Sequence, residues 1–511
     1  MRYLALAAGL LAVAETARGA TPVMKESDVV FMYTAEKEFL DQYGATWIAW
    51  GGGGSIPGIH TTGSFWCLTA GPRLLHDDPV LREAVCRDID GTPISPSWQL
   101  DNTYEGQPTW FGCTNNPAFR KHLREECLKA VADRPDGLHI DDPAGSFGST
   151  GAGGCYCDYC MKAFRKYLIG HDSPSLREQA GVRNWNGFDY RALVKRHTPT
   201  AKLYTNPQSL PLRREFIDFQ VEAMVDGIRE LGGLARSKLG PGMTLSVNTY
   251  YGGDASPNIA FVPVITHMVC EVEHHASEGT TRLMTPVGAY RQAETLGRPL
   301  AATASGSDRA WVKEHGAVNL AKVWIALSYA CGSRLMVPHP TMQWCHTQEK
   351  GTHWYKAPPG EFVPLYRFVR DNARLFDGYR TLGPLAPPSA VPATFTGESD
   401  RDALRKALAA GNPRPLSAGD GLWVFPRTKP TGEMVVHLVN TNYDAASDRL
   451  APQKDVRLSL PASVLNGSYR RAVLHSYDAA PVELRVEADS GGLRIKVPEV
   501  RTWAVFELSG N

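Results

Sequence analysis

The chain has 511 residues, of which 43% are hydrophobic and 21% charged, and its formal net charge is +1. This is the composition of a soluble globular protein, and the length exceeds that of one ordinary domain. Lysines and arginines are scattered without a basic stripe, so we expect no nucleic-acid partner and no membrane partner.

Residues 1–20 resemble a secretory signal. Met1-Arg2 is followed by an apolar run over residues 4–14 and then by small residues up to Ala20. The run is too short to span a bilayer as a helix, and no later segment is long and apolar enough to do so. An ordinary buried first helix is the alternative. We interpret the segment as a signal peptide, which predicts a secreted or periplasmic protein.

Apolar, β-rich runs alternate with amphipathic segments through residues 21–381. Eight runs are predicted strands: 29–33, 45–50, 60–67, 137–141, 243–250, 267–273, 299–304 and 333–338. Helical patterns separate most of them, and one helix is predicted to begin where Asn116, a typical N-cap, precedes Pro117. This alternation predicts a (β/α)₈ TIM barrel. A doubly wound open sheet is the alternative, but the chain has no glycine-rich nucleotide motif to support it.

The character of the sequence changes after residue 381. Residues 382–398 are rich in proline, glycine and small residues, which is typical of a linker. Residues 399–511 hold short alternating strands separated by turn residues, and this pattern predicts a C-terminal all-β sandwich.

Ten cysteines are present, and three of them fall in the segment CYCDYC as Cys155, Cys157 and Cys160. Such clustering suits a tetrahedral thiolate metal site, for which Cys113 in FGCTNNPAFRKHL is the best fourth ligand. A disulfide plus free thiols is the alternative in an exported protein. Of the other cysteines, five are candidates for one or two disulfides: Cys67, Cys86, Cys270, Cys331 and Cys345.

The surroundings of these cysteines resemble those of family 42 glycoside hydrolases and related glycosidases. The shared features are a cysteine before N-x-P-x-[F/Y]-R, a barrel strand with an acidic end, and C-x-C-x₂-C before an aromatic-rich helix, here MKAFRKYL. In that family four cysteines bind zinc, so the resemblance implies Cys113, Cys155, Cys157 and Cys160 as ligands of Zn²⁺. A closed four-sulfur site has no open position for water, so the zinc would be structural and catalysis would need no other cofactor.

Acidic residues end the fourth and sixth predicted strands, where a barrel carries its catalytic groups. Asp141 and Asp142 end the fourth strand, and Glu271 and Glu273 end the sixth, on one face by strand alternation. Glycosidic cleavage needs two such carboxyl groups. Adjacent aspartates raise each other's pKa, so one of the pair can remain protonated and only hydrogen-bond the sugar.

The chain departs from family 42 at both catalytic positions of that family. Asp142-Pro143 stands where family 42 has Asn-Glu, and the seventh predicted strand, LAATASGS, has no carboxylate before Asp308. The segment DGLHIDD also resembles the fourth strand of α-galactosidase-type barrels, in which an Asp there is the nucleophile and the acid/base ends the sixth strand. This resemblance implies that Asp141 or Asp142 attacks and that Glu271 or Glu273 donates the proton.

Aromatic and polar side chains cluster after several predicted strands, as expected of a carbohydrate site. The candidate substrate-binding residues are Trp50, His139, Asn248, Tyr250, His274, Trp344 and His346. The sequence thus predicts a secreted glycoside hydrolase acting on a poly- or oligosaccharide, with a retaining mechanism and carboxyl groups about 5 to 5.5 Å apart. A homo-oligomer is compatible with it.

Two other functions fit the same residues. One is a carbohydrate-binding barrel that has lost catalysis. The other is a metal-dependent hydrolase that uses His139, Asp141 and the His274-His275 pair.

Overall fold

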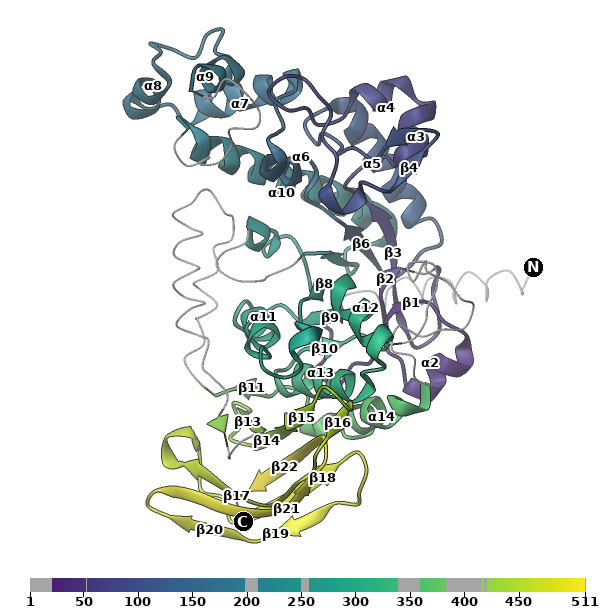
Figure 1. The fold of residues 1–511 in the computed structure, drawn as a ribbon, viewed down its shortest axis with the longest axis vertical. Coiled ribbons are helices and arrows are strands. Elements are labelled where there is room, and N and C mark those ends of the chain that lie inside the picture. Colours follow the sequence, from purple (N-terminus) through teal and green to yellow (C-terminus); the bar gives the residue numbers. More distant parts are fainter. Residues whose placement is uncertain are drawn as a thin grey trace, which may run out of the picture.

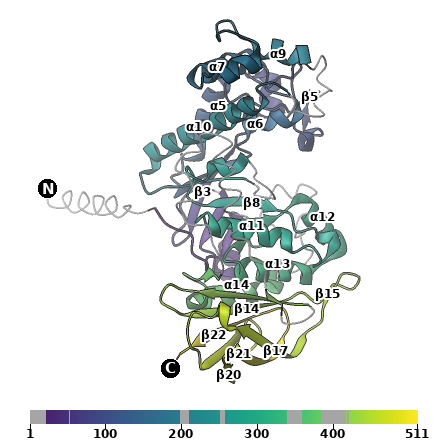
Figure 2. The same ribbon diagram turned by 90° about the vertical axis from the view of Figure 1, so that its left-hand side faces the viewer.

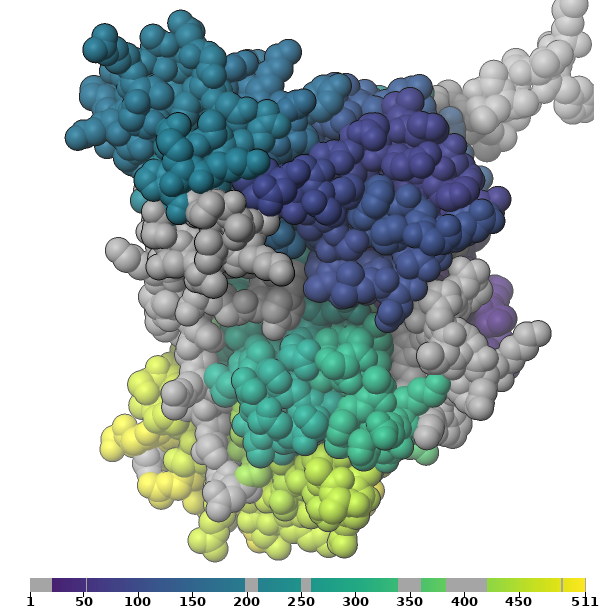
Figure 3. Space-filling view, turned by 45° about the horizontal axis from the view of Figure 1, so that its top comes forward, coloured from purple at the N-terminus to yellow at the C-terminus, as the bar shows by residue number. Residues whose placement is uncertain are grey.

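The computed structural model describes residues 21–51, 53–197, 210–249, 257–338, 359–382, 416–417 and 421–510. Three parts follow one another along the long axis of the molecule (Figure 1). An α/β domain lies in the middle, a mostly helical cap lies at one end, and a β-sandwich lies at the other. Figures 2 and 3 show the same succession from two further directions. The predicted signal peptide, residues 1–20, lies outside the described residues.

All eight strands predicted for the α/β domain are present, in the predicted order. They are β1 (Val30–Tyr33), β2 (Trp47–Gly51), β3 (His60–Trp66), β6 (Gly137–Asp141), β7 (Thr244–Val247), β8 (Met268–Val272), β9 (Leu300–Ala304) and β10 (Arg334–Leu335). They form two parallel sheets, β1-β2-β3-β6-β7 and β10-β9-β8. The sheets meet at two seams, where Asn248 bridges Val269 in parallel and Val337 N donates to Val30 O at 2.8 Å. A closed barrel needs an unbroken ring of strand-to-strand hydrogen bonds, and this part of the prediction stays a prediction.

Helices cover the outside of these sheets and pack through apolar faces. They include α2 (Lys37–Tyr43), α5 (Pro117–Ala130), α10 (Arg213–Leu239), α11 (Met284–Thr295), α12 (Gly306–His315), α13 (Val318–Ala330) and α14 (Val363–Asp371). The predicted start of α5 is confirmed, because the Asn116 side chain accepts a hydrogen bond from Ala118 N. Helix α13 is buried around most of its circumference, since it lies between the sheets and the sandwich.

The cap consists of residues 68–116, 145–197 and 210–212, which follow β3 and β6. Its elements are α3 (Pro72–Asp77), α4 (Pro79–Glu83), β4 (Thr103–Tyr104), β5 (Gln107–Pro108), α6 (Gly145–Gly148), α7 (Asp158–Gly170), α8 (Pro174–Ala180) and α9 (Tyr190–His197). Aromatic rings form much of its core, with Tyr156 stacked on Phe216 of α10 at 5.4 Å between ring centroids. The cap thus has an apolar core of its own beside the strand ends.

The C-terminal part contains two antiparallel sheets that share one apolar core, as a β-sandwich requires. The first joins β11 (Arg380–Thr381), β12 (Leu416–Ser417), β13 (Leu422–Thr428), β14 (Met434–Asn440), β22 (Trp503–Ser509), β18 (Arg471–Ser476) and β19 (Val482–Leu484). The second joins β17 (Gln453–Pro461), β21 (Gly492–Val500) and β20 (Val486–Asp489). Most of the predicted linker, from residue 383 on, lies outside the described residues.

The sandwich and the α/β domain share buried side chains. Trp503 of β22 is 1% exposed and packs against Tyr329 of α13 and Phe368 of α14, with ring centroids 6.0 and 5.3 Å away. Arg427 of β13 forms a buried ion pair with Glu294 of α11 at 3.0 Å. This junction therefore resembles the interior of one domain.

Disulfides were expected among the cysteines outside the cluster, and for the described ones that expectation is wrong. Cys67, Cys86, Cys270 and Cys331 are buried free thiols. All four belong to the buried core, and Cys86 lies beside the four-cysteine cluster, where its Sγ donates to Gly112 O. Cys345 lies outside the described residues.

Candidate active site

Asp141 is the last residue of β6, and the backbone turns at Asp142. Asp142 has a φ of 45°, a left-handed conformation that aspartate tolerates better than most residues. The turn gives the two carboxylates different partners. Asn248 Nδ2 donates to Asp141 Oδ1 at 2.9 Å, and Trp66 Nε1 donates to Asp142 Oδ2 at 2.9 Å. The adjacent aspartates are thus held by two separate donors from β3 and from the end of β7.

Glu271 brings a third carboxylate to the same space from β8. Strands β6 and β8 flank β7, and the negative charge of Glu271 raises the pKa of both Asp141 and Asp142. Arg309 of α12 holds Glu271, with Nη1 at 2.9 Å from Oε1, and the same nitrogen donates to Ala304 O. Glu271 is therefore close enough to act on both aspartates through its charge, and its role as their catalytic partner stays a prediction.

Asp141 has the more strongly perturbed carboxyl group. Burial raises its pKa to about 7, and the charges of Asp142 and Glu271 act in the same direction, whereas hydrogen bonds from Asn248 and Trp50 oppose the increase. Burial also raises the pKa of Asp142, against hydrogen bonds from Trp66 and Trp98. A carboxyl group with a pKa near neutrality can deliver a proton at physiological pH.

Glu273 and His274 lie past the end of β8 and differ in their surroundings. Glu273 Oε2 accepts a hydrogen bond from Ser307 Oγ at 3.2 Å, and its Oε1 accepts from His275 N. His274 is fully buried and stacks on Trp324. Its Nδ1 donates to Val272 O, and its Nε2 lies 2.8 Å from the Tyr290 hydroxyl. His274 thus has no surface with which to contact a sugar.

His139 points into the interior between the strands. It is fully buried beside Trp50, its Nδ1 lies 2.9 Å from Ser246 Oγ, and burial lowers its pKa to about 3. It is therefore a neutral core histidine beneath the carboxylates. Within the described ranges, the four cysteines form the one group of three or more candidate metal ligands, so His139, Asp141, His274 and His275 do not assemble the second metal site considered above.

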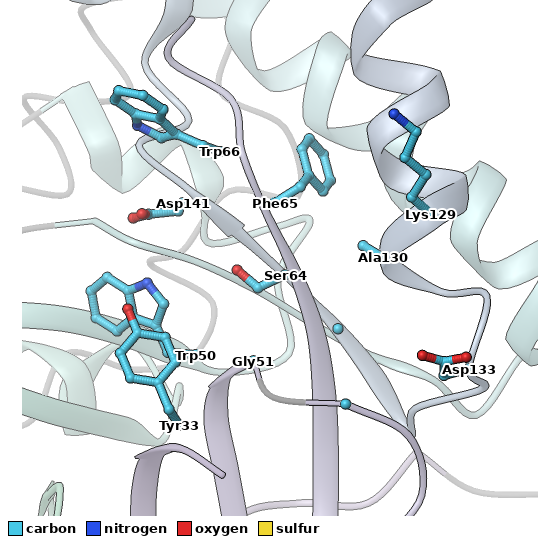
Figure 4. Close-up of a pocket in the computed structure, with 12 residues that line it drawn as sticks. Tyr33, Trp50, Gly51, Ser64, Phe65, Trp66, Lys129, Ala130, Asp133 and Asp141 are labelled. Atoms are coloured by element: carbon cyan, nitrogen blue, oxygen red, sulfur yellow. The ribbon is translucent and has the colours of Figure 1, made fainter. Parts of the chain in front are cut away.

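A cavity of about 410 Å³ opens at the ends of β1, β2, β3 and β6 (Figure 4). Asp141, Trp50, Trp66, Tyr33 and Ser64 lie on the same side of β3 in this view, whereas Phe65 points to the other side. The lining includes four aromatic side chains, the carboxylates of Asp133 and Asp141, and Lys129 from the end of α5. Aromatic faces next to polar groups suit a pyranose ring.

Trp98 is a site residue that the sequence did not indicate. It lies in the cap, on a short 3₁₀ turn (Ser97–Gln99), near enough to Asp142 to lower the pKa of that carboxyl group. No local signal marks it, because its position depends on how the cap folds over β6. The predicted contacts Tyr250, Trp344 and His346 lie outside the described residues, so they stay predictions.

The four cysteines named above meet inside the cap. Their sulfur atoms all lie within 4.8 Å of one another, and Cys113 Sγ lies 3.4 and 3.5 Å from those of Cys157 and Cys160. Zn–S bonds of about 2.3 Å would place the sulfurs about 3.8 Å apart, close to these distances. Asn115 and Gln220 also direct side-chain N–H groups at Cys160 Sγ, as expected around a thiolate ligand. These four buried cysteines could therefore hold a metal ion.

In the part of the chain that the structure describes, no helix combines the length and the apolar character needed to cross a membrane.

No protein-family model matches the chain. It is 22% identical to an α-agarase of Alteromonas agarilytica over 302 residues, which is 57% of this chain and 20% of that enzyme. It is also 22% identical to an α-agarase of Thalassotalea agarivorans over 341 residues, 64% of this chain and 23% of that enzyme. The chain thus spans about a fifth of the length of these curated relatives.

Two solved structures share its fold over nearly the whole length. One is α-L-fucosidase isoenzyme 2 from Paenibacillus thiaminolyticus, with a TM-score of 0.57, 12% identity, and coverage of 96% of this chain and 100% of the other. The other is a β-galactosidase from Bacillus circulans sp. alkalophilus, with a TM-score of 0.52, 10% identity, and coverage of 94% and 99%. By their names, all four similar proteins are carbohydrate-cleaving enzymes.

Proposed function

We propose that this chain is a glycoside hydrolase that cleaves O-glycosidic bonds of a poly- or oligosaccharide. The observation that carries the proposal is the meeting of Asp141, Asp142 and Glu271 beside a cavity lined by aromatic rings. The similarity to α-agarases in sequence and to a fucosidase and a β-galactosidase in fold supports it. The α-agarases also favour a polysaccharide substrate.

We assign the proton-donor role to Asp141 and the nucleophile role to Glu271. The raised pKa of Asp141 keeps a proton available for the leaving glycosidic oxygen, whereas Arg309 stabilises a negative charge on Glu271. In a retaining reaction, the Glu271 carboxylate bonds to the anomeric carbon as Asp141 protonates the leaving oxygen. Asp141 then takes a proton from the water that releases the sugar from Glu271. This assignment reverses the roles implied by the α-galactosidase-type resemblance.

Asp142 and Glu273 take supporting roles in this mechanism. The charge of Asp142 contributes to the raised pKa of Asp141. Glu273 accepts a hydrogen bond from Ser307 Oγ in the first turn of α12, and we assign it the role of accepting a hydrogen bond from a sugar hydroxyl as well.

The cysteine cluster is proposed to bind a structural Zn²⁺, as in the family 42 enzymes that the segment resembles. Cys113 follows the loop from β3, whereas the other three ligands follow β6, so the metal would tie the two parts of the cap together. We also propose that residues 1–20 direct export.

Turnover of aryl glycosides and of agarose-derived oligosaccharides, with product anomers followed by NMR, tests the function. Asp141→Asn and Glu271→Gln should each lower kcat by at least about a hundredfold, because each removes a group that acts in the chemical step. Asp226→Asn, which removes an exposed carboxylate on α10, is the control.

Three results would contradict the proposal or part of it. Binding of saccharides without turnover would favour the carbohydrate-binding barrel. Unchanged turnover in the Asp141→Asn variant would show that Asp141 is not the proton donor. Inverted product anomers would exclude the retaining mechanism.

A further inference from the structure

We propose that Trp98 forms a sugar-binding subsite on the cap, next to the carboxylates, that engages the substrate residue adjoining the cleaved bond. The proposal rests on the proposed function and adds a substrate preference to it: a chain of several sugar residues rather than a single glycoside.

The exposure of Trp98 is the first observation. Its side chain is 58% exposed, and among the described tryptophans it alone belongs to the strongly exposed large hydrophobic residues. By contrast, Trp50 is 5% exposed and Trp66 is half-buried. An indole face left in water costs hydrophobic free energy, so a strongly exposed tryptophan near an acidic site is a candidate ligand-binding surface.

The position of the ring is the second observation. Phe111, the aromatic neighbour of Trp98, has its ring beside Gly148 of α6, the short helix that follows Asp142, and the indole is near enough to Asp142 to lower the pKa of that carboxyl group. Phe111 packs against Trp98 in an edge-to-face contact, with centroids 6.0 Å apart and ring planes at 81°. These neighbours leave much of the indole surface open to solvent.

The chemistry of this surface fits a sugar ring. The C–H face of a pyranose stacks on an indole, while the ring hydroxyls remain free for polar partners. Trp66 donates to Asp142 from the α/β domain, and Trp98 approaches the same carboxylate from the cap. A sugar on Trp98 would therefore lie on the cap side of the carboxylates, one residue from the bond under attack.

Binding and turnover of agarose-derived oligosaccharides of increasing length test the subsite. Binding is measured by calorimetry in the inactive Asp141→Asn background, and kcat/KM is measured in the otherwise unaltered chain. Trp98→Ala should weaken binding of the longer oligosaccharides about tenfold, because stacking contributes free energy of that order. Trp98→Phe keeps a stacking face but lacks the N–H, so it should retain most of the binding and change the pH profile of kcat/KM.

The matched control is Tyr159→Ala, which removes an exposed aromatic side chain from a separate groove of the cap. Equal affinity of the Trp98→Ala and Tyr159→Ala variants for long oligosaccharides would overturn the proposal, as would the absence of binding to the unsubstituted Asp141→Asn chain. Binding that depends on Trp98 in a chain that releases no sugar would support the subsite and refute only the hydrolase function. Thermal melting of each variant identifies any loss of folding.

Discussion

Asp141→Asn is expected to make the folded chain more stable at neutral and alkaline pH, even as it removes the proposed proton donor. The pKa of Asp141 is raised from an ordinary 3.8 to about 7 in the folded state. Below about pH 4 the group is protonated in both states and contributes nothing. Between these values only the unfolded chain loses the proton, so the free energy of unfolding falls as pH rises. The loss of stability reaches its maximum above about pH 7, where the group is ionised in both states.

The size of this penalty follows from the two pKa values. At about 1.4 kcal/mol per pH unit, their difference corresponds to about 4 kcal/mol. Asp141 is largely buried but keeps some contact with solvent, whose screening reduces the penalty, and we expect about 2 kcal/mol. Asparagine has no ionised form to destabilise, and its amide oxygen can still accept the hydrogen bond from Asn248. The variant should thus gain about 2 kcal/mol above pH 7 and nothing near pH 4.

Urea denaturation of the unsubstituted chain and of the Asp141→Asn variant, across this pH range, measures the effect. Asp226→Asn controls for the loss of one negative charge at an exposed position. The reasoning is refuted if the stability difference between the Asp141 variant and the unsubstituted chain does not grow as pH rises from about 4 to about 7. In that case burial does not hold a proton on Asp141, and the role of proton donor would need another group.

Three further predictions concern the site, the cap and the domain junction. Asn248→Ala removes a donor that stabilises ionised Asp141, so the alkaline limb of the kcat/KM profile should move to higher pH; movement to lower pH would contradict the assignment. Cys113→Ser should abolish stoichiometric zinc in elemental analysis and lower the melting temperature, whereas Cys86→Ser, beside the cluster, should keep the metal. Arg427→Met leaves a buried carboxylate unpaired and should cost about 3–5 kcal/mol in urea denaturation; a smaller loss would mean that water reaches the junction.

The α/β framework could be predicted because its signals are local. Each of the eight strands is an apolar run bounded by polar or turn residues, and the Asn116-Pro117 pair marks a helix start without any tertiary information. The cap could not be predicted in this way. Its core consists of aromatic residues such as Tyr156 and Phe216, which are 60 positions apart in sequence and resemble the apolar face of any helix.

The site residues that lie at strand ends could be predicted from the sequence, whereas those placed by loops and by the cap could not. Asp141 and Glu271 follow from the ends of β6 and β8. Strand alternation placed Glu273 beside Glu271, yet β8 ends at Val272, so Glu273 follows the loop toward Ser307 instead. His274 seemed available for substrate because its partners, Tyr290 and Trp324, lie on later helices that the local sequence does not reveal.

The shared interior around Trp503 has a consequence for how the chain can be divided. Strand β11 (Arg380–Thr381) pairs with β13, and Asp448 accepts hydrogen bonds from Asn319 N at the start of α13, so both polar and apolar contacts cross the junction. A fragment truncated after residue 381 would expose the flank of α13 and leave Glu294 without its counter-ion. The catalytic half is thus expected to be insoluble when expressed alone, and the intact protein to melt in one cooperative transition across both halves.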